Sequence, residues 1–469
     1  MQSRVVPALT VFKIRKVYNV ENIKNLVQET IVRVKAQALK DARKDAKKKG
    51  KDSSSEESVI SYSNQLTRLR VPNVLLSYAV GKAYMQCGQM LTIYGKESVG
   101  KTTLGLYLMG QWIKQTGGFG IIMNSEGRAK FLDEDDPRLY QDLDSDKKLA
   151  KHMWDNNIIY VDITDLAETW TLMNKIVKKV RTFLPIDKPI IILLDVYNKV
   201  MDSGEVEMYD NMSGKSDKSL EQLEGGSNFL FSKTAQKCMR MQSDFLDKSN
   251  SFLICTAHQN EKVDTSANPY AKAPECDNTT WRGSRCLVQS CTHMWYLSRM
   301  GKVQKETADK NKVVTGKEIA LTVTKSSKGK EYRQISYILR IDDMKETEDW
   351  IEPSLDFYSP LAKFLERNKY AVQGGGTYRS ETFFPDQLTG KNAFDFGREI
   401  NENIEVRDKV LKTLKVLNFD DSNLVPLKLD EVLVNPEEIT VDDEPEEEEA
   451  KPKKKSKTKK SKEEDVSKE

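Results

Sequence analysis

The stretch that decides the fold is residues 95–102, which read Gly-Lys-Glu-Ser-Val-Gly-Lys-Thr. This is a full match to the pattern G-x-x-x-x-G-K-[ST], in which a glycine-rich loop turns its backbone N–H groups toward phosphate. The apolar run 90–94 precedes the loop and the mostly apolar run 103–109 follows it. These flanks predict the strand–loop–helix setting that the motif requires, and therefore binding of ATP or a closely related nucleoside triphosphate.

Each residue type in this loop suits one part of a triphosphate. Gly95 and Gly100 allow the backbone N–H groups to turn inward, and the start of the following helix adds its partial positive charge. Lys101 has the reach to contact the β- and γ-phosphates, and the Thr102 hydroxyl is a suitable ligand for Mg²⁺. The predicted nucleotide-binding residues are therefore Gly95, Lys96, Glu97, Ser98, Val99, Gly100, Lys101, Thr102 and Thr103.

Two later apolar runs are expected to bring carboxylates to the same loop. The run 190–195 ends in Asp195, and an aspartate at the end of such a strand helps to hold Mg²⁺ in P-loop proteins. The run 120–124 leads to Glu126, and the carboxyl ends of parallel strands line the ligand crevice. We predict Asp195, with Thr102, as the metal site and Glu126 as the group that aligns or deprotonates the attacking water. The spacing alone leaves open that Glu126 is an ordinary glutamate at a strand end.

Composition narrows the class of protein. At 469 residues the chain is long enough for one large domain with appendages or for two to three domains. Charged residues make up 31% and no apolar run approaches the length that crosses a bilayer, so we expect a soluble protein without a membrane partner. The 74 basic and 71 acidic residues nearly cancel, so net charge alone does not indicate a nucleic-acid partner. Six scattered cysteines without a C-x-x-C pair indicate reduced thiols in the cytoplasm rather than a zinc module.

Alternating segments predict an α/β fold around a mostly parallel sheet, because short apolar strands alternate with amphipathic helical patterns. We expect an N-terminal helical or oligomerisation segment with a linker over 1–60 and an ATPase core over 61–345. A small C-terminal α/β or helical domain over 346–435 and a disordered tail over 436–469, with acidic and lysine blocks, are expected to follow. The strands expected in the core are 90–95, 120–124, 158–162, 190–195, 251–257, 293–298, 317–325 and 332–341, with the last three extending the sheet antiparallel.

Several of these motifs resemble one family, and they occur in the same order. The phosphate loop resembles that of the bacterial RecA recombinase, which also has Glu-Ser and Gly-Lys-Thr-Thr. The segment 123–126 is similar to that family's strand ending in the catalytic glutamate, and 192–195 to its Mg²⁺ strand. The segment 251–260 is similar to the strand whose glutamine responds to the γ-phosphate, here Gln259. The Leu-Arg-Val-Pro of residues 69–72 resembles the lead-in to the family's core.

The resemblance implies a RecA-like P-loop ATPase core that uses ATP and Mg²⁺. Such a protein forms a helical filament on single-stranded DNA and pairs it with homologous duplex DNA in recombination and repair. A single-strand-binding protein and a loader are further expected partners. The resemblance makes Lys101, Glu126 and Gln259 catalytic, and it implies that hairpin lysines, Lys325 first and Lys328 second, reach the γ-phosphate on a neighbouring subunit. The match at these lysines is loose, so the alternative of exposed lysines without a catalytic role stays open.

The resemblance also implies two loops that bind DNA. The first falls within 202–227, and the helix after it carries two cations seven residues apart, which suits contact with backbone phosphates on one helix face. The second runs over about 260–284 and ends near Trp281, whose indole either stacks on bases or packs within the protein. The predicted DNA-binding residues are Lys233, Arg240, Trp281, Arg282 and Arg285.

The sequence leaves one subsite and two other functions open. The tyrosine that stacks on adenine in the family has no clear counterpart, with Phe131 and Tyr140 as candidates. A hexameric helicase with a RecA-type core is one alternative function, but it would use an arginine finger where this chain has lysines. A mediator paralogue that binds nucleotide without catalysis is the other, and the intact Lys101, Glu126 and Asp195 argue against it.

Overall fold

The computed structural model describes residues 66–125, 140–163, 166–197, 234–239, 242, 244–261, 279–280, 286–306, 312–327, 331–341, 347–385 and 389–416. For residues 166, 260, 261, 279, 280 and 286 it describes the backbone only. All of these residues lie within the compact unit formed by 18–433.

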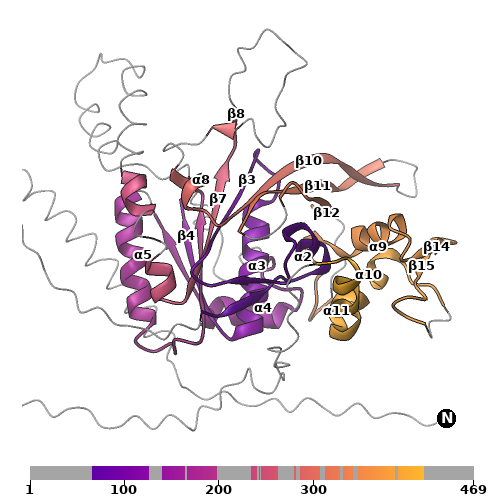
Figure 1. Ribbon diagram of the computed structural model, residues 1–469, viewed down its shortest axis with the longest axis horizontal. Helices are drawn as coiled ribbons and strands as arrows, with labels where there is room; N and C mark the ends of the chain where they lie inside the picture. The colour runs from indigo at the N-terminus through magenta and orange to yellow at the C-terminus, as the bar shows by residue number, and fades with distance from the viewer. Residues whose placement is uncertain are drawn as a thin grey trace, which may run out of the picture. The chain divides into compact units, whose positions relative to one another are not determined.

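A nine-stranded mixed sheet forms the centre of this unit, in the order β13-β12-β11-β10-β3-β7-β6-β4-β5 (Figure 1). The strands from β10 to β5 in this order pair in parallel, and β11, β12 and β13 extend the sheet antiparallel beyond β10. The bounds are β3 Met90–Gly95, β4 Phe119–Asn124, β5 Ile158–Asp162, β6 Ile190–Asp195, β7 Ser251–His258, β10 His293–Glu306, β11 Lys312–Ser326, β12 Gln334–Arg340 and β13 Leu355–Asp356. The expected α/β class and the mostly parallel sheet are confirmed, and β11 and β12 extend the sheet antiparallel as expected. The expectation for 293–298 is wrong, because this segment begins β10 and pairs in parallel with β3.

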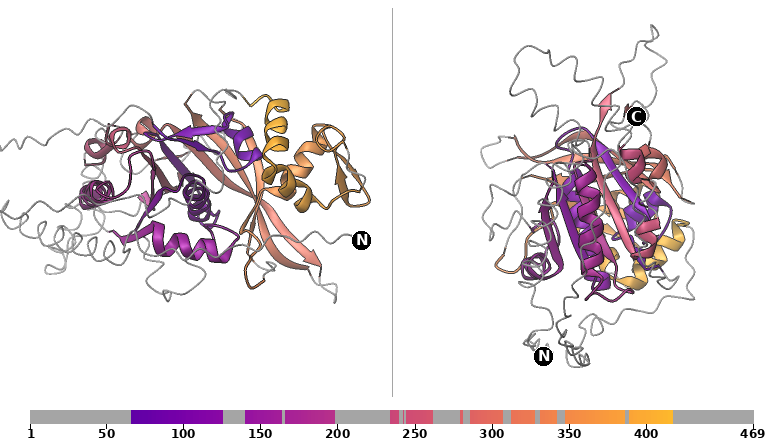
Figure 2. Two further views of the ribbon diagram at one scale, coloured as in Figure 1. Left: turned by 90° about the horizontal axis from the view of Figure 1, so that it is seen from below. Right: turned by 90° about the vertical axis from the view of Figure 1, so that its left-hand side faces the viewer.

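Helices cover both faces of the sheet, which explains why its parallel strands are continuous apolar runs. Figure 2 shows helices on both sides of the sheet. Alternate residues of β6 belong to opposite sides: Ile191 and Leu193 share a buried cluster with residues of α3 and α4, whereas Ile192 and Leu194 share one with residues of α5 and α8. The bounds are α2 Val74–Val80, α3 Lys101–Thr116, α4 Lys147–Asn157, α5 Leu166–Val180, α8 Cys286–Ser290, α9 Tyr358–Arg367, α10 Ala393–Glu402 and α11 Ile404–Thr413.

The strands differ from the prediction mainly in the antiparallel half. β10 and β11 are longer than the expected 293–298 and 317–325, because the two strands continue as a ribbon with polar and exposed side chains beyond the covered sheet. Apolar periodicity does not mark such a ribbon, since little of it is buried.

The C-terminal helices pack on the same core as α2 and α3. Leu361 of α9, Phe396 of α10 and Val410 of α11 belong to the buried cluster that includes the α3 side of the sheet. The amide oxygen of Asn401 also accepts a hydrogen bond from the N–H of Val74 at 2.9 Å. Residues 371–379 form a small hairpin of β14 (Val372–Gly374) and β15 (Thr377–Arg379), with Gly375 and Gly376 in left-handed conformations at its turn. The domain boundaries near residues 60, 345 and 435 stay predictions.

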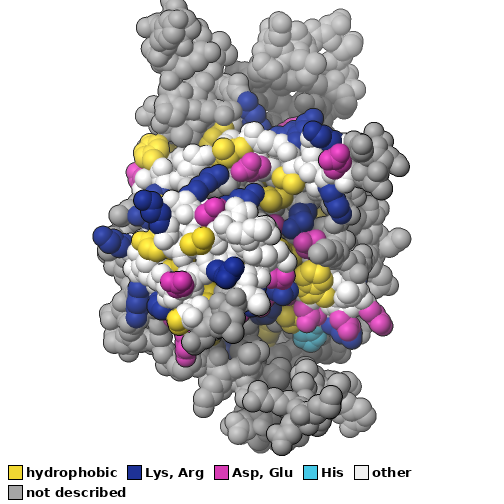
Figure 3. Space-filling model, turned by 90° about the vertical axis from the view of Figure 1, so that its right-hand side faces the viewer, with side chains coloured by type: hydrophobic (Ala, Val, Ile, Leu, Met, Phe, Trp, Pro, Cys, Tyr) yellow, Lys and Arg dark blue, Asp and Glu magenta, His cyan; other side chains and the backbone are white. Residues whose placement is uncertain are grey.

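Two further short ladders complete the described structure. β1 (Arg68–Arg70) pairs with β2 (Tyr84–Gln86), and β8 (Asn260–Glu261) pairs with β9 (Thr279–Thr280), both antiparallel. On the face viewed in Figure 3, Lys and Arg side chains are interspersed with Asp and Glu. Within the described ranges, none of the helices combines the length and apolarity needed to cross a bilayer.

Candidate nucleotide-binding site

The predicted phosphate loop connects β3 to α3, so the expected strand–loop–helix setting is confirmed. Gly100 precedes α3 in a left-handed conformation with φ 79°, which glycine adopts without the penalty of a Cβ. Gly95 is required for a different reason, because a Cβ at this position would lie 2.2 Å from the carbonyl oxygen of Leu297 on β10. The two glycines of the motif therefore serve a tight turn and a close approach of backbone, respectively.

The Lys101 side chain folds back into the loop. Its ammonium donates hydrogen bonds to the carbonyl oxygens of Gly95 at 3.1 Å and Lys96 at 2.7 Å, and only 6% of the residue is exposed. A buried cation is stable only when it is well paired, and these carbonyls provide part of that pairing. The loop therefore holds a positive charge at the start of α3, where the helix dipole already favours an anion.

The predicted metal residues Thr102 and Asp195 lie in direct contact. The Thr102 hydroxyl donates to the Asp195 carboxylate, with oxygen–oxygen distances of 3.0 and 3.1 Å. Thr256 of β7 donates to the same carboxylate at 2.5 Å. Asp195 is 3% exposed, so these hydroxyls hold a buried carboxylate in place. The sequence did not single out Thr256, because only the strand order β3-β7-β6 brings it beside Asp195.

The oxygen atoms of Thr102 and Asp195 fit a magnesium ion. Mg²⁺ prefers oxygen ligands and is often held by one or two carboxylates together with water and substrate phosphates. Among the residues that the structure describes, no group of three or more His, Cys, Asp or Glu side chains is arranged to hold a metal by itself. Thr102 and Asp195 are the residues that would hold such an ion.

The ends of β4 and β7 are tied to the same edge of the sheet. The N–H of Gln259 donates to the carbonyl oxygen of Gly95 at 3.1 Å, which joins the end of β7 to the start of the loop. The N–H of Ser125 donates to the Asp195 carbonyl at 2.6 Å, and the Ser125 hydroxyl makes two 2.9 Å bonds with the backbone of Val196. Ser125, the residue before Glu126, is thus bonded to the end of β6. Glu126 itself lies outside the described residues.

A cavity of about 360 Å³ lies beside α3, and Thr103 is the lining residue nearest in sequence to the loop. Its lining includes Tyr107 of α3, Tyr358 of α9 and Phe394 of α10, together with Asp142 and Ser354. Burial raises the pKa of Asp142, while side-chain hydrogen bonds with Ser354 and Thr103 oppose that rise. Burial also raises the pKa of Tyr107 to about 12, so its hydroxyl stays protonated at neutral pH. The cavity combines aromatic rings with a few polar groups, as ligand pockets commonly do.

The two sequence-based candidates for an aromatic partner of the base, Phe131 and Tyr140, stay predictions. Tyr140 is buried in the core with the Lys151 ammonium 5.7 Å from its ring centroid, and it is not among the residues that line the cavity. Phe131 lies outside the described residues. The sequence offered no signal for Tyr358, which follows Thr103 by more than two hundred residues and belongs to the C-terminal region.

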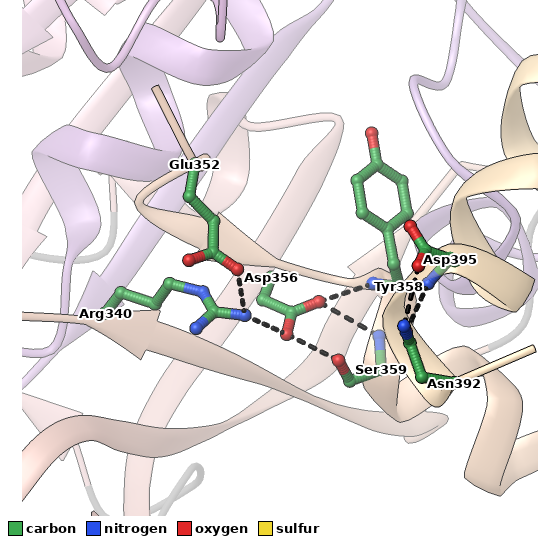
Figure 4. Close-up of polar contacts among 7 residues, drawn as sticks. All are labelled: Arg340, Glu352, Asp356, Tyr358, Ser359, Asn392 and Asp395. Carbon is green, nitrogen blue, oxygen red and sulfur yellow. Dashed lines mark hydrogen bonds and ion pairs between the residues drawn. The ribbon is translucent and has the colours of Figure 1, made fainter. Parts of the chain in front are cut away.

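Tyr358 is positioned by a network of charged and polar groups at the start of α9 (Figure 4). Asp356 is fully buried and accepts hydrogen bonds from the N–H groups of Tyr358 and Ser359, both at 2.9 Å. Arg340 of β12 donates to Asp356 at 2.8 Å and forms an ion pair with Glu352 at 3.0 Å. The first turn of α9 is thereby attached to the central sheet, which orders one wall of the cavity.

Lys325 is not brought to the loop of its own chain. In the sheet, Lys325 lies opposite Met294, and Met294 lies opposite Thr92, three residues before the loop begins. Beyond Lys325, β11 continues away from the loop. Its ammonium donates to the carbonyl oxygens of Val288 at 2.7 Å and Gln289 at 3.5 Å, near the end of α8. The other predicted site residues outside the described residues are Lys328, Lys233, Arg240, Trp281, Arg282 and Arg285.

Comparison with protein-family models finds no matching family, and comparison with curated proteins finds no significant match.

Proposed function

We propose that this chain is a DNA-dependent ATPase of the RecA type, which hydrolyses ATP to ADP and phosphate with Mg²⁺. The observation that carries the proposal is the hydrogen bond between Thr102 and Asp195 beside the buried Lys101 ammonium. Phosphoryl transfer depends mainly on positioning and on cations around the transferred group. A cation, an oxygen pair suited to Mg²⁺ and a helix N-terminus within one loop meet that requirement.

Each residue of the proposed site has one role in hydrolysis. Lys101 turns from the loop carbonyls to the β- and γ-phosphates, and Thr102 and Asp195 hold Mg²⁺, which would neutralise charge on the phosphate oxygens. Gln259, whose backbone is bonded to Gly95, lies at the loop to respond to the γ-phosphate. The nucleotide base enters the cavity beside Thr103 and contacts the ring of Tyr358. Glu126 activates the attacking water, as proposed from the sequence.

We further propose that the ATPase acts as a recombinase in the cytoplasm, forming a filament on single-stranded DNA and pairing it with a homologous duplex. The order of the sequence motifs supports this part. The position of Lys325 also supports the filament proposal. Its ammonium bonds to a carbonyl oxygen in α8 and not to the phosphate loop of its own chain, so this lysine can take part in hydrolysis only at the loop of another copy. Lys328 is the second lysine proposed for that role. The proposed DNA contacts are Lys233, Arg240, Trp281, Arg282 and Arg285.

ATP turnover with and without single-stranded DNA tests the proposal. We expect strong stimulation by DNA in the wild type and loss of turnover by at least about 10²-fold in Lys101→Ala, because the cation at the transferred phosphate is removed. Lys363→Ala is a matched control, since it removes an exposed lysine of α9. Turnover that ignores DNA would overturn the recombinase proposal, and full turnover in Lys101→Ala would overturn the ATP site itself.

Electron microscopy tests the assembly. With single-stranded DNA and a slowly hydrolysed ATP analogue, the wild type should form helical filaments, and the analogue should be required for them. Closed hexameric rings would instead favour a helicase, and discrete particles with little turnover would favour a mediator.

A further inference from the structure

The antiparallel half of the sheet contacts the outer side of the phosphate loop at two points. Lys317 of β11 donates from its ammonium to the carbonyl oxygen of Ser98 at 3.0 Å. Its partner across the ladder is Leu339 of β12, so the two side chains share one face of the sheet. A methyl carbon of Leu339 lies only 3.0 Å from the position that a Cβ on Gly100 would occupy. One polar and one apolar contact from neighbouring strands thus hold the loop at Ser98 and Gly100.

Ser98 is the residue of the loop that most needs such support. Its φ is 56°, in the left-handed region that residues with a Cβ rarely adopt. Strained backbone of this kind persists where surrounding contacts fix it, and it is concentrated at sites that clamp ligands. The Lys317 hydrogen bond is such a contact, and it joins residues 219 positions apart.

A second lysine stands beside the first. Lys302 of β10 pairs directly with Lys317, which places two ammonium groups on the same face of the ribbon. Like charges in this arrangement are unfavourable. The Ser98 carbonyl oxygen is the negative end of a peptide dipole, so its hydrogen bond offsets this repulsion for Lys317. Lys302 does not share that bond. The pair therefore offers a comparison between two similar charges, one with this contact and one without it.

We propose that Lys317 is a positioning residue for the nucleotide's β-phosphate, acting through the Ser98–Val99 peptide. In a planar trans peptide the C=O and the following N–H point in opposite directions. Holding the Ser98 carbonyl outward at Lys317 therefore directs the Val99 N–H into the loop. The cation also polarises that peptide, which makes its N–H a stronger donor to phosphate. This inference rests on the proposed nucleotide binding and adds to it a residue from the antiparallel half of the sheet.

Equilibrium binding of Mg²⁺–ADP to the full chain tests this role, with Lys317→Met, Lys317→Arg and Lys302→Met compared with the wild type. We expect Lys317→Met to bind about 5- to 20-fold more weakly, the equivalent of one partly exposed charge-assisted hydrogen bond. Lys317→Arg should stay within about threefold of the wild type, because a guanidinium still donates to the Ser98 carbonyl. Lys302→Met should also stay within about threefold, since it removes the neighbouring charge but not the contact.

Three results would overturn the inference. Equal weakening in Lys317→Met and Lys302→Met would assign the effect to the general field of positive charge. Wild-type affinity in Lys317→Met would show that the contact does not matter for binding. A lower unfolding midpoint of nucleotide-free Lys317→Met, with weak binding that arginine does not rescue, would assign a merely structural role. If the proposed nucleotide binding itself is wrong, the result is distinguishable, because the wild type would then bind Mg²⁺–ADP no better than Lys101→Ala.

Discussion

The two halves of the central sheet contribute to the candidate site in different ways. The parallel half, from β3 to β5, supplies the groups expected to touch phosphate and Mg²⁺, namely the loop, Thr102 and Asp195. The antiparallel half, from β10 to β13, supplies groups that hold the site from outside, through Lys317 at Ser98 and Arg340 at the start of α9. The groups expected to carry the chemistry and the groups that support them therefore come from separate parts of the chain, so changes in the two halves should have different consequences.

The largest effect should come from the parallel half. Asp195→Asn keeps the size of the side chain but removes the charge that favours Mg²⁺ and weakens the acceptor for Thr102 and Thr256. We expect Mg²⁺-dependent turnover to fall by about 10³-fold, since a metal supplies several kcal/mol to phosphoryl transfer. Turnover measured across a Mg²⁺ titration checks this, and a wild-type Mg²⁺ dependence in the variant would remove Asp195 from the metal site.

The antiparallel half should respond in stability. Asp356→Ala leaves Arg340 and the first turn of α9 without their buried acceptor, so we expect a loss of about 3 kcal/mol in the free energy of unfolding. The matched control is Asp395→Ala, whose carboxylate is 42% exposed beside Arg398 and should cost at most about 1 kcal/mol. Denaturant unfolding of both variants makes the comparison. Equal losses would mean that the Asp356 network does not attach α9 in the way described.

A substitution at Glu126, which follows β4 in the sequence, should affect ATP hydrolysis without affecting ATP binding. Glu126→Gln should leave ATP affinity nearly unchanged while turnover falls by about 10²-fold or more, because the positioned base is lost. Paired binding and turnover assays measure this split. Unchanged turnover would show that another group activates the water.

The smallest expected effect is a change in the pH dependence of stability. It concerns His293 of β10, which lies opposite Leu91 of β3 where the two halves of the sheet meet. Burial, with the nearby charges of Lys82 and Lys325, lowers the pKa of His293 from 6.5 to about 3. The unfolded chain therefore takes up a proton below about pH 6.5 while the folded chain does not, so this histidine's contribution to stability is present above that pH and falls as the pH drops toward 3.

The loss from His293 should approach about 1.4 kcal/mol per pH unit over the lower part of this window. His293→Gln should remove that share of the slope between pH 6 and 4.5. Unfolding free energies at several pH values check the difference, and parallel slopes for the wild type and His293→Gln would contradict it.

The same division decides how much of the molecule could be predicted from sequence. The strand–loop–helix setting of residues 90–116 and the position of Asp195 at the end of β6 were predictable, because each occupies one continuous stretch with an apolar strand. The parallel strands were predictable as well, since burial on both faces makes them apolar throughout. Thr256 was not, because its position beside Asp195 depends on β7 lying between β3 and β6, and strand order is not written in any local pattern.

The supporting groups were missed for a related reason. Lys317 and Arg340 lie in strands with mixed polar and apolar residues, where a cation that bonds to the loop or to Asp356 looks like any exposed one. Tyr358 lies in the C-terminal region, and no local pattern connects that region with Thr103. Long-range contacts of this kind follow from packing of the completed core, which residue spacing does not encode.

Equilibrium binding of ATP with and without Mg²⁺, measured by calorimetry on the wild type and Lys101→Ala, tests the central claim most directly. The wild type should bind one ATP per chain, more tightly when Mg²⁺ is present, and Lys101→Ala should lose at least about tenfold in affinity, the range of a hydrogen bond to a charged group. Equal affinity in the two proteins, or no ATP binding by the wild type, would contradict the assignment of residues 95–102 as the nucleotide site.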